Sequence, residues 1–217
     1  MKLPGIIQKS QNPPGFNSEV EYLTFLLKGF KTVVSDSEKL IPSLLSDSLW
    51  IQKTEFYVQL YSGKQFIFTQ GFSTAKVCFP AYSRGLNPDL LLAMLFQHYG
   101  VWIMTRTRLI EIADDLRLWI ADKISQTGFM DQNTKQKLFL QIAGDIWMFL
   151  LANQKSIFLF RQNLVNCNIT ILSNEAGINQ PDTNQLRCKL MADYDRNWLN
   201  RLVKSAEQQH NLLRKSS

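Results

Sequence analysis

The longest helix-forming segment of the chain extends from Asn87 to Ile124 and reads NPDLLLAMLFQHYGVWIMTRTRLIEIADDLRLWIADKI. Asn87 can accept a hydrogen bond from the free amides of a first helical turn, and Pro88 suits the first helical position. A stripe with steps of three and four residues then holds over several turns. Its members are Leu91, Leu95, His98, Trp102, Thr105, Leu109, Ile112, Leu116, Trp119 and Ile120. The spacing predicts one helix on the order of 50 Å long, with much of the remaining apolar chain packed along it.

Two shorter helices are predicted ahead of this segment. Residues 1–17 contain three prolines and two glycines, so we expect an extended arm there. Ser18 and Glu21 have the spacing of a capping box, and the apolar residues after them predict a helix to about Val34. A second, short helix is expected to begin at Ser37.

The periodicity then changes to that of strands. Lys53–Tyr61 and Gln65–Gln70 are rich in aromatic and β-branched residues, and Ser62-Gly63-Lys64 between them predicts a β-hairpin. Phe72–Phe79 is expected to form a third strand. Alternation gives the hairpin an even face (Phe56, Val58, Leu60, Phe66 and Phe68) and an odd face (Tyr57, Gln59, Tyr61, Ile67 and Thr69). A sheet this small requires a helix over its even face for stability.

Helices are also predicted beyond the long segment. Asp131 can cap a helix from Gln132 to about Ala152, whose core is apolar on nearly every side. Residues 156–172 are ambiguous between a continued helix and a strand. Asp182 with Gln185 predicts a last helix that ends near Leu213.

These elements together predict an α+β fold that is mostly helical, with a bundle of long helices beside one small antiparallel three-stranded sheet, the hairpin plus the third strand. After the arm, we expect residues 18–217 to form a single domain. Within it, residues 18–86 supply two helices and a β-meander, and residues 87–217 supply the helical part.

Composition limits the class of protein. Of 217 residues, 45% are hydrophobic and 19% are charged, which is typical of a globular protein. The net charge of +6 is spread along the chain without a dense basic run. Three cysteines far apart in sequence, Cys78, Cys167 and Cys188, predict reduced thiols rather than disulfides. With no signal peptide and no membrane span expected, the sequence predicts a cytoplasmic protein.

No set of residues in the sequence matches an enzyme motif. His98 is on the apolar stripe and is interpreted as a core histidine, because no metal ligand is at helical spacing from it. The acidic group Glu111, Asp114 and Asp115 is flanked by arginines and is interpreted as an ion-paired surface. We therefore expect no enzymatic activity, no cofactor and no bound metal.

Asp145 is the most unusual residue by its context, since it lies among apolar residues of the helix predicted from Gln132. A charge there must find a partner or take up a proton. We expect a buried ion pair with an arginine of the 87–124 helix. The neighbouring Gly144 would allow a second helix to approach closely.

The odd face of the hairpin is the candidate interaction face. It places Tyr57, Tyr61 and Ile67 together, and three lysines, Lys53, Lys64 and Lys76, lie near its strands. Tyrosines beside lysines can stack on bases and hold phosphates, but the same face can equally pack on a protein. Five tryptophans and 14 phenylalanines also favour protein contacts. The sequence therefore predicts a non-enzymatic adaptor or accessory subunit with protein partners, and a nucleic-acid-binding accessory protein as the alternative; the oligomeric state is left open.

Overall fold

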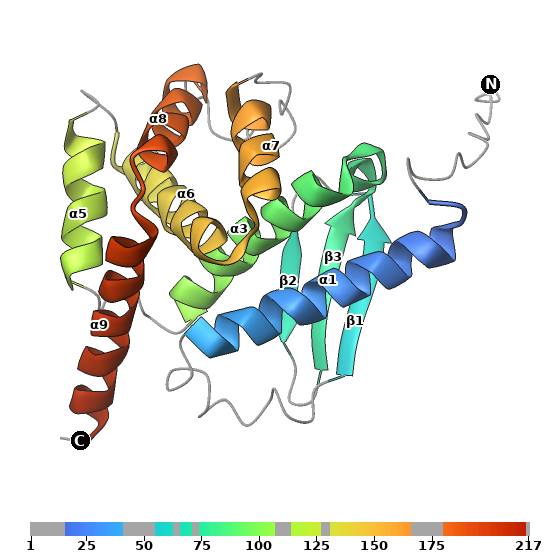
Figure 1. Ribbon diagram of the computed structural model, residues 1–217, viewed down its shortest axis with the longest axis horizontal. Helices are drawn as coiled ribbons and strands as arrows, with labels where there is room; N and C mark the ends of the chain where they lie inside the picture. The colour runs from blue at the N-terminus through green and yellow to red at the C-terminus, as the bar shows by residue number, and fades with distance from the viewer. Residues whose placement is uncertain are drawn as a thin grey trace, which may run out of the picture.

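The computed structural model describes residues 16–40, 55–62, 66–70, 74–106, 114–126, 131–165 and 180–215. Its elements in chain order are α1 (Glu19–Leu40), β1 (Glu55–Tyr61), β2 (Ile67–Gln70), β3 (Thr74–Pro80), the 3-10 turn η1 (Ala81–Gly85), α3 (Pro88–Arg106), α5 (Asp114–Ser125), α6 (Gln132–Leu151), α7 (Gln154–Val165), α8 (Gln180–Ala192) and α9 (Arg196–Lys215). Figure 1 shows the sheet on one side of the molecule, crossed by α1, and α5, α6, α8 and α9 grouped on the other. The predicted class, α+β and mostly helical, is confirmed for these residues. The arm predicted for 1–17 lies outside them apart from its last two residues.

The sheet is mixed, so the predicted antiparallel meander is wrong. The strand order is β1-β3-β2, with β1 parallel to β3 and β2 antiparallel to it. The predicted hairpin between the first two strands does not form, because β3 lies between them. Burial explains this order: Val77 and Phe79 of β3 are fully buried. A meander would have placed these two residues at the edge of the sheet.

Helices α1 and α3 cover the even face of the sheet. The Phe68 ring of β2 contacts Phe30 of α1 at 6.0 Å and Tyr99 of α3 at 5.6 Å between ring centroids. Phe66, just before β2, packs against Phe79 of β3. The expected helical cover over this face is therefore present, and it comes from two helices.

The segment 87–124 does not form one continuous helix. Its first part is α3, and its second part is α5, which starts at Asp114 after residues that lie outside the described ranges. The two helices run in different directions (Figure 1), and both contact α6, but α3 also packs on α1 and α7 whereas α5 also packs on α9. Two acidic residues, Asp114 and Asp115, occupy the first turn of α5. Acidic side chains stabilise a helix N-terminus, so Asp114 and Asp115 indicate that a new helix begins within the apolar stripe.

Helices α3 and α6 cross at two glycines and form the centre of the core. A Cβ added to Gly100 of α3 would come within 2.3 Å of Trp147 Cβ on α6. A Cβ added to Gly144 of α6 would come within 2.6 Å of the Gln97 carbonyl oxygen. Trp147 is fully buried at this crossing. The absence of side chains at both glycines is what allows the two backbones to approach so closely.

Helix α1 continues to Leu40, so the predicted break before Ser37 is wrong. The capping box is confirmed at the start of the helix, where the Glu21 amide donates to Ser18 Oγ at 3.1 Å. Ser37 does not cap a new helix. Its hydroxyl donates to the Val33 carbonyl at 2.7 Å and accepts from Trp147 Nε1 at 3.0 Å. The serine thereby ties α1 to α6.

The C-terminal half contains one more break between helices than the sequence predicted. The helix predicted from Gln132 is confirmed as α6, capped by Asp131, whose carboxylate accepts from the Thr134 amide at 3.0 Å. The ambiguous residues from 156 to 165 are helical in α7, and the rest of that segment lies outside the described part. The last predicted helix is divided into α8 and α9. The Asp195 carboxylate accepts from the Trp198 amide at 2.7 Å and caps α9, a signal that sequence reasoning missed.

Candidate interaction face

The strand register collects the odd-numbered residues of β1 and β2 on the side of the sheet away from α1 and α3. Because β3 pairs with both neighbours, Tyr57 stands opposite Lys76, which stands opposite Thr69. The next row along the strands is Gln59, Cys78 and Ile67. We call this side of the sheet the outer face. Its described residues are Glu55, Tyr57, Gln59, Tyr61, Ile67, Thr69, Thr74, Lys76 and Cys78.

The outer face combines exposed apolar groups with little net charge. Tyr57 is 48% exposed and Ile67 is 42% exposed, and Gln59 and Thr69 are exposed between them. Lys76 and Cys78 of the central strand are half-buried. The charged residues among those described are Glu55 and Lys76, one of each sign. Such a surface offers contact area at its edges and hydrogen-bonding groups at its centre.

Glu55 fixes the orientation of Tyr57. The Tyr57 hydroxyl donates to the Glu55 carboxylate two residues earlier on the same strand. This hydrogen bond, and then the negative charge of Glu55, raise the pKa of the Tyr57 phenol above its ordinary value. The phenol therefore stays neutral. With its hydroxyl engaged, Tyr57 presents mainly its ring to a binding partner.

The structure brings together part of the predicted site. Tyr57, Tyr61, Ile67 and Lys76 share the outer face, whereas Lys53 and Lys64 lie outside the described residues. Sequence reasoning missed Cys78 and did not assign Lys76 to the same row as Tyr57. Both depend on which strand is central, and alternation along a single strand carries no information about that.

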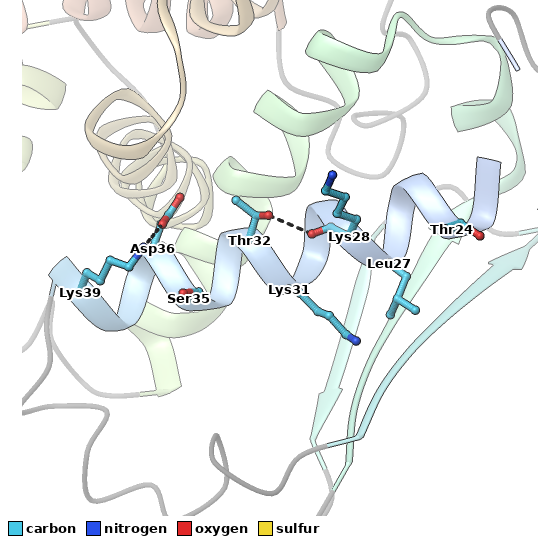
Figure 2. Close-up of a pocket in the computed structure, with 8 residues that line it drawn as sticks. All are labelled: Thr24, Leu27, Lys28, Lys31, Thr32, Ser35, Asp36 and Lys39. Carbon is cyan, nitrogen blue, oxygen red and sulfur yellow. Dashed lines mark hydrogen bonds and ion pairs between the residues drawn. The ribbon is translucent and has the colours of Figure 1, made fainter. Parts of the chain in front are cut away.

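A surface pocket of about 530 Å³ lies on α1. Figure 2 shows its described lining residues, all from this helix. Lys28 and Lys31 extend to opposite sides of the helix, and Lys39 forms an ion pair with Asp36 at 2.9 Å. The Thr32 hydroxyl donates to the Lys28 carbonyl at 3.0 Å. The cationic groups do not converge on one point, as recognition of a small anion would require.

Asp145 is fully buried and paired with Arg187 of α8, not with an arginine of the 87–124 segment as predicted. The guanidinium donates to both carboxylate oxygens, with Nε–Oδ2 at 2.7 Å and Nη2–Oδ1 at 2.6 Å. Burial raises the pKa of Asp145, and the charge of Arg187 opposes that rise. Arg187 also lies over the Phe160 ring. The pair therefore fixes α8 on α6 within the core.

His98 is partly buried and stacks on Phe66 with ring centroids 4.7 Å apart. Burial, with a smaller contribution from the Arg187 charge, lowers its pKa from 6.5 to about 4. Between pH 6.5 and about pH 4 the imidazole is protonated in the unfolded chain but stays neutral in the folded protein. The free energy of unfolding should therefore fall as the pH falls through this window. We expect a loss of about 2 kcal/mol, less than the full shift implies because the ring is partly exposed.

Urea unfolding across that pH range measures this effect. His98→Gln, which does not titrate, should show a flatter dependence of the unfolding free energy on pH than the parent. An equal slope in the two proteins would mean that other groups cause the acid sensitivity.

Two absences concern only the part of the chain that the structure describes. No group of three or more His, Cys, Asp or Glu side chains there is arranged to hold a metal ion. None of the helices described combines the length and hydropathy needed to cross a membrane. Comparisons with protein families, with curated proteins and with solved structures find no match to this chain.

Proposed function

We propose that this protein is a non-enzymatic interaction protein, an adaptor or accessory subunit of a larger intracellular assembly, and that it binds a protein partner through the outer face of its sheet. The observation that carries the proposal is the exposure of Tyr57 and Ile67 on a sheet whose other face is packed. Large apolar groups that remain exposed on such a surface favour protein contact.

The electrostatics of the outer face favour a protein over a nucleic acid. A single-strand platform combines stacking aromatic rings with several cations along the backbone path. The described outer face has one lysine, Lys76, and Glu55 offsets its charge. A partner that meets this surface needs apolar groups for Tyr57 and Ile67 and one acceptor for Lys76.

The alternative function is nucleic-acid binding, and one observation supports it. Tyr57 and Lys76 stand side by side in one cross-strand row, so a base could stack on the ring while a phosphate meets the ammonium. In that case Tyr57→Ala should weaken single-strand binding by about 1–3 kcal/mol. The affinity should also fall steeply with salt.

Substitution of the outer face should separate these functions. Tyr57→Ser with Ile67→Ser removes both exposed apolar groups from the outer face. Leu118→Ser is the matched control, because Leu118 is 59% exposed but lies on α5. We expect the double variant, and not the control, to lose a partner that co-purifies with the parent from native cells after nuclease treatment. A partner retained by the double variant would contradict the proposal, and one released by nuclease would favour the alternative.

A further inference from the structure

The two exposed apolar side chains of the outer face lie diagonally across its central strand. Tyr57 of β1 is paired with Lys76 of β3. Ile67 of β2 is paired with Cys78, further along β3. With about 4.8 Å between neighbouring strands and about 3.3 Å per residue along them, the Cα atoms of Tyr57 and Ile67 are about 12 Å apart. The line that joins them crosses β3 between Lys76 and Cys78.

Lys76 places a positive charge near the middle of that line. Its side chain is half-buried, whereas Tyr57 and Ile67 are 48% and 42% exposed. Within the described part of the chain, none of the ion pairs includes Lys76. The Glu55 carboxylate accepts from the Tyr57 hydroxyl instead, and Glu55 lies one row further from Ile67 than Tyr57 does. The centre of the outer face therefore offers a positive charge to a binding partner.

A partner segment that lies on this face must pair its own backbone groups. The backbone groups of β3 point towards β1 and β2, in the plane of the sheet, and pair with those strands. An extended segment laid on the face would bury N–H and C=O groups without partners, which costs free energy. An α-helix pairs these groups internally, and helices α1 and α3 already cover the opposite face (Figure 1). A helix is therefore the segment that suits the outer face.

We propose that the outer face binds an amphipathic helix of the partner, in which two apolar residues flank one acidic residue. This inference rests on the function proposed above. Helical residues seven or eight positions apart share one side of the helix and are about 10.5 to 12 Å apart, so two such apolar residues contact Tyr57 and Ile67 together. An Asp or Glu midway between them lies on the same side, where its carboxylate meets the Lys76 ammonium.

Selection from a random peptide library displayed on phage, with the full chain as the target, tests this pattern. The peptides should be long enough for four helical turns. We expect the selected peptides to have two large apolar residues seven or eight positions apart and an Asp or Glu midway between them. Apolar residues that alternate with a period of two, a middle position without acidic enrichment, or a failure to select any peptide would each overturn the proposal.

Substitution of Lys76 should change the preferred charge at the middle position. Against Lys76→Glu, the selection should enrich Lys or Arg there in place of the acidic residue. Against Lys76→Gln, which keeps a polar side chain without the charge, neither sign should be enriched. Lys137→Glu, the matched control at an exposed position of α6, should keep the acidic preference. An acidic preference that persists with both Lys76 variants would overturn the ion pair.

Fluorescence anisotropy with one peptide selected by the parent measures the size of the effect. Lys76→Glu should weaken the affinity at least about tenfold, because two carboxylates then face each other. A peptide with Lys at the middle position should restore the affinity. Circular dichroism should show that the variants fold as the parent does. Equal affinity of the parent and Lys76→Glu for the acidic peptide would contradict the proposal.

The peptide pattern and the native partner distinguish this inference from the function on which it rests. If Tyr57→Ser with Ile67→Ser releases the co-purifying partner while the selected peptides lack the acidic residue, the inference fails and the proposed function stands. If the double variant retains that partner, the proposed function fails.

Discussion

Asp145→Ala should lower the free energy of unfolding by about 3–5 kcal/mol, because the substitution leaves Arg187 charged and unpaired inside the core. Both side chains are excluded from solvent, at 0% and 6% exposure, so water cannot replace the lost partner. Urea unfolding monitored by circular dichroism measures the change. A variant that unfolds within about 1 kcal/mol of the parent would contradict the role given to this pair.

Two further variants separate the burial of the pair from the loss of an ion pair in general. Asp145→Leu with Arg187→Met removes both charges, so it should cost less than Asp145→Ala alone. Arg117→Ala breaks the exposed pair with Asp114, whose atoms are 2.8 Å apart, and should cost less than about 1 kcal/mol. If all three variants lost equal stability, the cost would not come from an unpaired buried charge.

Gly100→Ala should destabilise the protein by about 2–3 kcal/mol, despite the higher helix propensity of alanine. The new methyl group would meet Trp147 Cβ, Cγ and Cδ1, all closer than 3.0 Å, near the backbone of α6. Trp147 cannot rotate away from a contact at its own Cβ, so α3 and α6 must separate. Thermal or urea unfolding measures the loss.

The other glycines provide matched comparisons for this prediction. Gly29→Ala also adds a methyl group to a helix, but it meets the flexible end of Leu92 at 2.7 Å and should cost less. Gly85→Ala meets no atom within 4 Å and should be nearly neutral. Equal effects at Gly100 and Gly85 would mean that the close crossing of α3 and α6 does not limit stability.

The sequence predicted local structure well where the signal was local. Ser18 with Glu21 located the start of α1, and Asp131 located the start of α6. In contrast, the long stripe after Asn87 could not reveal a change of direction, because the same spacing holds on both sides of it. The acidic first turn of α5 and the Asp195 cap of α9 were the available signals.

What the sequence could not supply was the set of tertiary partners. A two-strand pattern with a short polar connection favours a hairpin, but the burial of Val77 and Phe79 requires β3 at the centre of the sheet. Likewise, the context of Asp145 predicted a buried pair but could not identify Arg187, 42 residues away. The outer face was predicted from alternation in β1 and β2, while its central row depended on the strand order.

Site-specific photocrosslinking is the most direct test of the proposed interaction through the outer face. A photoreactive residue at Gln59, in the middle of β1, should give a discrete crosslinked product in native cells that protease removes and nuclease does not. The same residue at Leu118 on α5 should not give this product. No product specific to Gln59, or a product removed by nuclease, would contradict a protein partner on this face.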